Sequence, residues 1–341
     1  MQSSQNAKMP WIEKYRPVSL DQIMSHQDII LTLDKFIEMK TIPHLLFFGP
    51  SGTGKTSTIK CCARKIYGDY MTYMVLELNA SNDRGIDTVR TKIKNFVSNK
   101  TRIFLPDHMR NLFKLVILDE SDSMTIEAQG MLRQIIEKNS ATTRFCLICN
   151  DIDKLNIALQ SRCALFCFLP LPLKDMLKKL NEICTFEKIK HEPNALQTII
   201  KISKGDMRSA INTLQHINLT VDNEITVENI YRISGFCVPA VIEHIFALLR
   251  DLHLNRLTIE GCVNETIDIV LENSITIFNL LSELAPKVMD SAYTDNQKIF
   301  LIDNFALIET YDAVNIDPRV ILMIISSLFI ILRRVNWVLI V

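Results

Sequence analysis

The sequence has little glycine, no net charge and no long hydrophobic run. Among its 341 residues are nine glycines, and 38 basic side chains balance 38 acidic ones. A net charge of zero excludes a uniformly basic nucleic-acid coat but says nothing about local patches. The length predicts two or three domains, and a hydrophobic fraction of 48% argues against intrinsic disorder. Three of the glycines (Gly49, Gly52 and Gly54) fall within six residues, which is the first indication of function.

The cysteines do not form a pattern typical of secreted proteins. Nine cysteines, an odd number, are scattered along the chain, which favours a reducing compartment over a disulfide framework. Four of them resemble a zinc quartet in raw spacing, namely Cys146, Cys149, Cys163 and Cys167. However, Cys146 and Cys149 fall on a predicted strand, where residues three apart point to opposite faces. We therefore expect buried packing cysteines rather than a zinc site.

No segment is predicted to cross a membrane. The first residues, MQSSQNAKMPW, contain no apolar run, so we expect no signal peptide. The stretch 320–341 is the strongest candidate, but two serines, two arginines and an asparagine interrupt it. No unbroken apolar span of about 18 residues remains. We expect a buried helix in this stretch and no membrane partner.

Strand-like and helix-like segments alternate in the first half of the chain. Short apolar runs at 44–48, 72–78, 115–118, 145–149 and 165–169 are typical of buried parallel strands, and segments of helical period lie between them at 56–67, 88–99 and 125–138. This order predicts a doubly wound α/β domain. Pro170 and Pro172 end the alternation, the periodicity is helical from there on, and Gly235 and Pro239 mark a further boundary. We expect an α/β nucleotide-binding domain over residues 1–170, a small helical lid domain over 171–234 and an all-α domain over 235–341.

A glycine-rich segment after the first predicted strand matches the phosphate-binding P-loop pattern G-x-x-x-x-G-K-[ST]. It reads Gly49-Pro50-Ser51-Gly52-Thr53-Gly54-Lys55-Thr56, and Ser57 follows it. The glycines allow backbone N–H groups to surround an anion, and the N-terminus of the following helix adds partial positive charge. Lys55 is expected to neutralise the β- and γ-phosphates of ATP, and Thr56 to place its hydroxyl on Mg²⁺.

A hydrophobic strand predicted at 115–118 ends in two carboxylates, Asp119 and Glu120, as in the Walker B arrangement. We expect Asp119 to hold the Mg²⁺ shell and Glu120 to polarise the attacking water. A further predicted strand ends at Asn150, whose amide can reach the γ-phosphate or the water. Paired carboxylates and strand-end asparagines are often only turn residues, so both assignments depend on the P-loop upstream.

Charge is unevenly distributed although the chain is neutral. Residues 84–114 contain eight basic and two acidic side chains, whereas residues 236–341 contain seven basic and thirteen acidic ones. Arg84, Arg90, Lys92 and Lys94 lie at the start and on the polar side of the helix predicted at 88–99. That placement suits contacts with a phosphate backbone. From charge alone, a solvated helix face is an equally good explanation.

Together these motifs resemble the AAA+ ATPases, and in particular the small subunits of replication factor C, the eukaryotic sliding-clamp loader. The likeness is densest over residues 11–215. It includes the boxes WIEKYRP at 11–17, ELNASNDRGID at 77–87, LDESD at 118–122, SRC at 161–163 and GDMR at 205–208. Residues 25–28 and 139–150 are most similar to the small subunit numbered five in human and three in yeast. Ser51 departs from the family pattern, which has a second proline at this position, and after Phe236 the likeness rests on order and length.

The resemblance implies roles for residues that the motifs alone do not define. Arg162, in the SRC box, resembles the arginine finger that reaches the γ-phosphate held by a neighbouring subunit. Arg208 resembles sensor 2, which contacts the γ-phosphate within its own subunit, and Asn150 corresponds to sensor 1. The segment that lines the adenine is expected at Tyr15, Arg16, Pro17, Ile23 and Met24. Without the resemblance, each of these has a plainer explanation as a surface, turn or packing residue, and for Arg162 and Asn150 that explanation is the better one.

The resemblance also implies partners and a cellular location. The expected function is ATP binding and hydrolysis, with Mg²⁺, in a heteropentamer of replication factor C subunits. This complex opens the sliding clamp PCNA and loads it onto primer–template DNA for replication and repair, so we expect the protein in the nucleus. Arg84 and Arg90 match arginines that line the central DNA channel. Two alternatives stay open: a non-hydrolysing scaffold that binds ATP only to assemble, and another AAA+ DNA remodeller that works as a homohexamer.

Overall fold

The chain divides into two compact units. The first comprises Met1–Ile189 and Leu196–His216, and the second comprises Lys190–Ala195 and Ile217–Val341. The computed structural model describes residues 9–81, 86–99, 112–221, 224–236, 238–250, 259–273, 275–312 and 316–334. The first unit contains every candidate site residue named above.

A five-stranded parallel sheet forms the centre of the first unit. Its strands are β1 (Leu45–Phe48), β2 (Val75–Asn79), β3 (Lys114–Asp119), β4 (Thr143–Cys149) and β5 (Ala164–Cys167). They lie in the order β2–β3–β4–β1–β5, and every neighbouring pair is parallel. Largely apolar strands of this kind are typical of parallel sheets that are covered on both faces. The sheet confirms the predicted doubly wound α/β fold.

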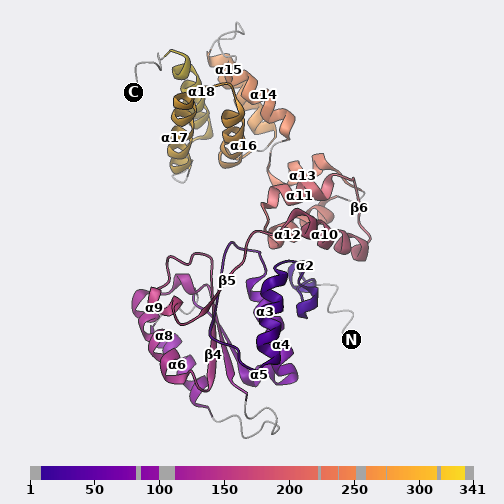
Figure 1. Cartoon of the computed structure of the whole chain (residues 1–341). Coiled ribbons are helices and arrows are strands. Elements are labelled where there is room, and N and C mark those ends of the chain that lie inside the picture. The colour runs from indigo at the N-terminus through magenta and orange to yellow at the C-terminus, as the bar shows by residue number, and fades with distance from the viewer. Residues whose placement is uncertain are drawn as a thin grey trace. The chain divides into compact units, whose positions relative to one another are not determined.

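Helices cover both faces of this sheet, with α3 and α4 on one side and α6 and α8 on the other (Figure 1). Their bounds are α3 (Gln27–Glu38), α4 (Lys55–Tyr67), α6 (Ile86–Ser98) and α8 (Ile126–Asn139). Phe47 of β1 shares a core cluster with Ile59 of α4. The adjacent Leu46 shares the opposite cluster with Leu132 of α8, because successive strand residues point to opposite faces. This packing fixes the strand ends from which the site residues project.

Several strand boundaries differ from the sequence prediction, among them the start of β2 and the end of β5. β2 begins at Val75 rather than at residue 72, because Met71–Met74 form a short helix, α5, after the 3₁₀ turn η2 (Gly68–Tyr70). Val75 is the first β2 residue in the ladder, opposite Leu115, so the residues before it extend beyond the pairing. Met74 is nevertheless fully buried, which explains why an apolar run alone did not reveal the helix. β5 ends at Cys167 rather than at residue 169.

Helices follow the sheet, and short elements lie before it and between its strands. The helices after β5 are α10 (Leu173–Glu187), α11 (Ala195–Ser203) and α12 (Met207–Thr220), and the short elements are α2 (Trp11–Lys14), η1 (Leu20–Gln22), η4 (Ser121–Ser123) and α9 (Ile157–Gln160). Pro172 is the N-cap residue of α10, a position that does not require the N–H that proline lacks. Met176, Leu180 and Ile183 recur at helical spacing and are buried.

The second unit begins with a feature that the sequence prediction missed. β6 (Lys190–His191) pairs in parallel with β7 (Glu224–Ile225). The prediction of helical structure alone over residues 171–234 is therefore wrong at these four residues. Strands of two residues are too short to show an alternating pattern. The helix α13 (Val227–Ser234) follows, capped by the hydroxyl of Thr226.

The remaining described helices of the second unit share one hydrophobic core. They are α14 (Pro239–Arg250), α15 (Ile259–Glu272), α16 (Ile277–Asp290), α17 (Asp295–Asp312) and α18 (Pro318–Arg334). Ile321, Ile325 and Phe329 of α18 are buried in this core. Within the described part of the chain, no single helix is long and apolar enough to cross a membrane. Only α13 and α14 together, bent by 64° at their junction, meet that criterion of length and composition.

Candidate active site

The P-loop connects β1 to α4, and its glycines adopt backbone angles that other residues rarely do. The φ angle is 137° at Gly49, 67° at Gly52 and 99° at Gly54. A Cβ at Gly49 would lie 2.0 Å from the carbonyl oxygen of Phe168, the residue after β5, so only glycine fits there. A Cβ at Gly54 would meet no atom of the described residues within 4 Å. The start of α4 thus faces open space, where its N–H groups and dipole favour an anion.

Lys55, the first residue of α4, is buried, with 6% of its surface exposed. Its Nζ donates hydrogen bonds to the carbonyl oxygens of Gly49 (2.6 Å) and Pro50 (2.7 Å) and to Oδ1 of Asn150 (3.0 Å). Burial lowers the pKa of the ammonium group, and the nearby carboxylate of Asp119 opposes this shift. All three acceptors are neutral, so the buried cation lies where an anionic ligand would stabilise it further.

The end of β3 brings two oxygen ligands together beside the P-loop. The hydroxyl of Thr56 donates to Oδ2 of Asp119 at 2.8 Å, and Oδ1 of Asp119 accepts from the backbone N–H of Glu120 at 2.9 Å. Hydroxyl and carboxylate oxygens are ligands that Mg²⁺ prefers, so this pair fits the expected metal. Glu120 is exposed and has a φ angle of 54°, which ends the strand and turns the chain into η4.

Asp122, which the sequence analysis did not single out, holds the end of β4. Its Oδ2 accepts hydrogen bonds from the backbone N–H groups of Asn150 (3.1 Å) and Asp151 (3.3 Å). Because the side chain of Asn150 contacts Lys55, a chain of hydrogen bonds runs from η4 through the end of β4 to the P-loop. The P-loop, the strand end at Asp119 and the strand end at Asn150, which were predicted as separate motifs, are therefore joined by hydrogen bonds into one group.

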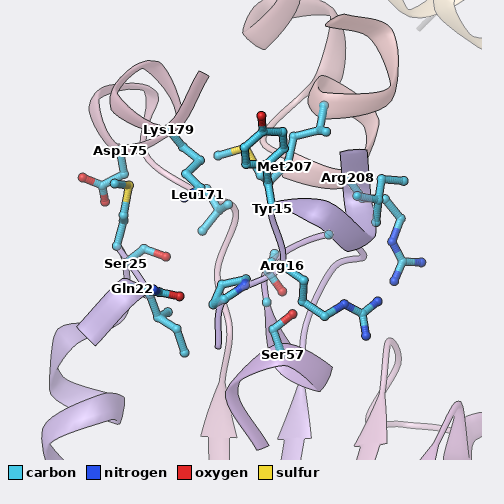
Figure 2. A pocket seen from close by; sticks show the side chains of 18 of the residues that line it. Tyr15, Arg16, Gln22, Ser25, Ser57, Leu171, Asp175, Lys179, Met207 and Arg208 are labelled. Carbon is cyan, nitrogen blue, oxygen red and sulfur yellow. The ribbon is translucent and has the colours of Figure 1, made fainter. Parts of the chain in front are cut away.

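A pocket lies over the start of α4, between the N-terminal segment and helices α10 and α12 (Figure 2). Of the residues predicted to bind the nucleotide, those that line it are Tyr15, Arg16, Pro17, Ile23, Met24, Gly52, Thr53, Gly54, Lys55, Thr56, Ser57 and Arg208. The pocket is also lined by residues that were not predicted, namely Ile12, Gln22, Ser25, Leu171, Asp175, Lys179, Met207 and Ile211. Asp175 and Lys179, like Met207 and Ile211, are four residues apart on one helix and therefore lie on the same face of it. Once one residue of a pair is assigned to the pocket, this spacing predicts that the other also lines it. In Figure 2, Arg16 and Arg208 lie on one side of the pocket and Ser25 and Asp175 on the other.

The N-terminal segment that forms one wall is bound to helices α10 and α12. Lys14 Nζ lies 2.5 Å from Oε1 of Glu187, and the hydroxyl of Tyr15 donates to the same oxygen. The backbone N–H of Trp11 donates to Oε1 of Gln215 at 3.0 Å. Burial and the hydrogen bond to Glu187 both raise the pKa of Tyr15, so its phenol stays protonated. These contacts place Tyr15 at the pocket.

Arg162 does not line this pocket. Its Nη2 lies 2.5 Å from Oε1 of Glu137 on α8, and its Nη1 donates to the carbonyl oxygen of Ala158 at 2.7 Å. Glu137 also accepts from Arg133 Nε at 3.2 Å, and this hydrogen bond, together with the charge of Arg162, lowers the pKa of the glutamate. Arg162 is thus an exposed residue whose guanidinium is ion-paired with Glu137.

The predicted DNA contacts are only partly covered by the structure. Arg84 lies outside the described residues, and so does the side chain of Arg90. Lys92 and Lys94 are exposed on α6. The C-terminal end of α6 is held by the buried Lys114, whose Nζ donates to the carbonyl oxygens of Phe96 and Asn99, both at 2.6 Å.

The four cysteines whose spacing along the sequence resembles a zinc site differ in their burial. Cys146 and Cys149 are buried on β4, whereas Cys167 on β5 is exposed. Burial raises the pKa of the Cys149 thiol to about 12. In the part of the chain that the structure describes, no group of three or more His, Cys, Asp or Glu side chains is arranged to hold a metal ion.

Comparison with known proteins agrees with this geometry. Residues 45–171 match the ATPase family associated with various cellular activities (AAA), and residues 178–219 match the RCF1/5-like AAA+ ATPase lid domain. A putative replication factor C small subunit of Acanthamoeba polyphaga mimivirus is 64% identical over 96% of this chain and 96% of its own length. The chain belongs to the replication factor C small-subunit family. It is accordingly a AAA+ ATPase that binds a nucleotide.

Other relatives refine the position within this family. Replication factor C subunit 3 of Schizosaccharomyces pombe is 44% identical over 88% of this chain and 84% of its own length. Replication factor C subunit 5 of Homo sapiens is 40% identical over 95% and 92%. The predicted likeness to the small subunit numbered five in human and three in yeast is confirmed. Among solved structures, a variant of RuvB from Thermotoga maritima has the same fold, with a TM-score of 0.50 at 15% identity over 80% of this chain and 91% of that one.

Proposed function

We propose that this chain binds and hydrolyses ATP within a heteropentameric clamp loader, which opens the sliding clamp PCNA and loads it onto primer–template DNA for replication and repair. The observation that carries the proposal is the connection between the P-loop and two strand ends. Lys55 is bonded to Asn150 at the end of β4, and Thr56 is bonded to Asp119 at the end of β3. The names of the relatives, all replication factor C subunits, support the coupling of this site to clamp loading.

In the proposed site, the P-loop holds the phosphates of ATP and the N-terminal segment lines the adenine. The P-loop ligands are Gly49, Pro50, Ser51, Gly52, Thr53, Gly54, Lys55, Thr56 and Ser57, and the adenine-side residues are Tyr15, Arg16, Pro17, Ile23 and Met24. Thr56 and Asp119 hold Mg²⁺, which when bound supplies positive charge at the phosphates. Glu120 orients and polarises the attacking water, which is the task of a carboxylate at the edge of a phosphate site.

Three further residues complete the proposed chemistry. Asn150 acts as sensor 1 beside the ammonium of Lys55, and Arg208 acts as sensor 2 from the start of α12. Arg162 serves a neighbouring subunit rather than its own, since its guanidinium is exposed on the surface. Arginine suits that task because its planar charge is permanent and matches phosphate oxygens.

The remaining proposals concern DNA, domains and location. Lys92 and Lys94 are exposed on α6 and offer positive charge to a phosphate backbone, and Arg84 and Arg90 are proposed to act with them. We retain three functional domains over residues 1–170, 171–234 and 235–341, the last as the oligomeric collar. Eukaryotic relatives support a place in the DNA replication machinery, and we propose the nucleus as its location.

The deciding experiment compares ATP turnover in the reconstituted pentamer with wild-type chain and with Glu120→Gln. The variant is expected to keep ATP binding and assembly and to lose the clamp- and DNA-stimulated turnover that this subunit contributes. Unchanged stimulated turnover would instead support the non-hydrolysing scaffold. Glu127→Gln is a matched control, because Glu127 is exposed in the first turn of α8 and belongs to no proposed site.

Assembly separates the proposal from the other alternative. Native mass spectrometry of the co-purified complex is expected to show one copy of this chain among four different subunits. A ring composed only of this chain would contradict the proposal and support a homohexameric remodeller.

A further inference from the structure

The tip of the P-loop is joined to the start of α12 by contacts that ATP chemistry does not require. The hydroxyl of Ser51 donates to Oδ2 of Asp206 at 2.8 Å, and the backbone N–H of Met207 donates to the carbonyl oxygen of Gly52 at 3.3 Å. The other oxygen of Asp206, Oδ1, accepts from the backbone N–H of Ser209 at 3.0 Å. One carboxylate is therefore shared between the P-loop and the first turn of α12.

Gly52 allows this close approach. Its φ angle is 67°, and a Cβ at this position would lie 1.8 Å from Oδ1 and 2.2 Å from Cγ of Asp206. Any other residue here would displace the carboxylate. Gly52 thus admits Asp206 to the loop in addition to turning the backbone.

Ser51 provides the donor through its side-chain hydroxyl. An apolar residue at this position would have no side-chain donor, so the contact with Asp206 depends on the serine. The bond joins residues that are 155 positions apart. It therefore acts as a tertiary constraint between two segments that both lead into the nucleotide pocket.

We infer that Ser51 and Asp206 form a latch that positions Arg208 at the nucleotide pocket. Arg208 follows Asp206 by two residues, lies in the first turn of α12 and lines the pocket together with Gly54 and Thr56. Fixing Asp206 to the P-loop fixes the start of α12, and with it the reach of Arg208 toward the phosphate groups. Ser51 and Asp206 are positioning residues. The inference rests on the proposed function, because Arg208 can act only if the pocket holds a triphosphate.

The latch predicts slower release of ATP. A hydrogen bond to a charged group contributes more than a neutral one, but Ser51 is exposed and water competes for Asp206. Losing the bond is therefore expected to speed release about threefold to tenfold. ATP affinity falls by the same factor if the association rate is unchanged.

The test measures the release rate of a fluorescent ATP analogue from the full-length chain after mixing with excess unlabelled ATP. Ser51→Ala is expected to speed release by the factor given above, and Ser51→Thr, which keeps the hydroxyl, to restore the wild-type rate. Ser209→Ala is the matched control, since the Asp206 contact uses the backbone N–H of Ser209 rather than its hydroxyl. Equal release rates for wild type and Ser51→Ala would overturn the inference.

A double-mutant comparison shows whether the latch acts through Arg208. In an Arg208→Ala background, adding Ser51→Ala is expected to produce no further acceleration. An equal acceleration in both backgrounds would overturn the inference, because the serine would then act on the P-loop alone. Lys55→Ala tests the proposed site independently. Retained ATP binding in that variant would refute the site, whereas lost binding with an inert Ser51→Ala would refute only the latch.

Discussion

The ammonium group of Lys55 lies 3.0 Å from the amide oxygen of Asn150, a residue 95 positions further along the chain. The contact exists because β1 and β4 are parallel neighbours whose last residues, Phe48 and Cys149, are opposite each other. Both strands therefore end at one level of the sheet. The P-loop and the strand-end amide leave the sheet side by side, where both can face the same phosphate.

Asn150→Ala is expected to reduce ATP turnover at this site by at least about tenfold, with a much smaller effect on ATP affinity. A preorganised donor near developing charge contributes mainly in the transition state, whereas Lys55 and the P-loop supply most of the ground-state binding. Single-turnover hydrolysis and equilibrium binding, measured on the same preparation, separate the two effects. Asn181→Ala on α10 is the control, since its amide donates to the carbonyl oxygen of Leu177 of the same helix in the described part of the chain. Loss of binding and turnover by the same factor would contradict this division.

Asp122→Ala is expected to impair the site although Asp122 contacts no part of the P-loop in the described hydrogen bonds. The substitution leaves the N–H groups of Asn150 and Asp151 without their acceptor, which costs about 1–3 kcal/mol for a buried donor and less where water replaces it. A lower urea midpoint and slower turnover should appear together. Asp122→Asn keeps an acceptor oxygen and should restore most of the urea midpoint and most of the turnover rate. Equal defects in Asp122→Ala and Asp122→Asn would show that the negative charge, rather than the hydrogen bonds, is responsible.

Local motifs could be predicted from the sequence because their residues are contiguous. The P-loop needs a strand, a glycine-rich turn and a helix in succession, and all three lie within residues 45–67. Asp119 and Glu120 were found for the same reason, at the end of an apolar run. The strands of the sheet were also predictable, since each is a short, mostly apolar segment.

The long-range partners could not be predicted in the same way. Asp122 meets Asn150, and Asp206 meets Ser51, only because the sheet order and the return of α12 bring these segments together. The pairing of Arg162 with Glu137 likewise depends on how α9 packs beside α8. No periodic pattern encodes such meetings, because each depends on tertiary packing rather than on spacing along one element.

Arg162→Ala is expected to reduce ATP turnover in the neighbouring subunit by a factor of up to about 10³, while ATP binding by this chain is unchanged. In the structure the guanidinium is paired with Glu137 at 2.5 Å, so it must exchange this carboxylate for a phosphate to act. The assay is turnover in a reconstituted pentamer whose other sites carry inactivating substitutions. Weaker ATP binding by the altered chain itself would contradict the placement of Arg162.

Lys94→Ala should weaken binding of the assembled complex to primer–template DNA without regard to sequence. Lys94 is exposed on α6, and each lost phosphate contact lowers the slope of the logarithm of affinity against the logarithm of salt concentration by about 1. Anisotropy titrations at several salt concentrations measure this slope. Lys174→Ala, on α10 and outside the proposed DNA surface, serves as the control. An unchanged slope for Lys94→Ala would remove α6 from the DNA interface.

The stability of the first unit is expected to fall with acid because of His44, which precedes β1. Its Nδ1 accepts a hydrogen bond from the backbone N–H of Phe145 at 3.2 Å. Burial, with a smaller contribution from the charge of Arg144, lowers the pKa of His44 to about 4 from its usual 6.5. As the pH falls from 6.5 toward 4, the unfolded chain takes up a proton that folded His44 does not. The free energy of unfolding therefore decreases across this range, and the contribution is fully present above pH 6.5.

His44→Gln tests this assignment, since the glutamine amide keeps an acceptor for Phe145 but does not titrate. The urea midpoints of both proteins are measured at about pH 7.5 and at about pH 5, a range that spans most of the predicted loss. Wild type should lose more stability on acidification than His44→Gln, and the exposed His244→Gln should behave as wild type does. An equal loss of stability on acidification in wild type and His44→Gln would show that other groups cause the effect.

His44 lies directly before β1, the strand that leads into the P-loop. If acid partly unfolds this strand, ATP binding should weaken on acidification more in wild type than in His44→Gln.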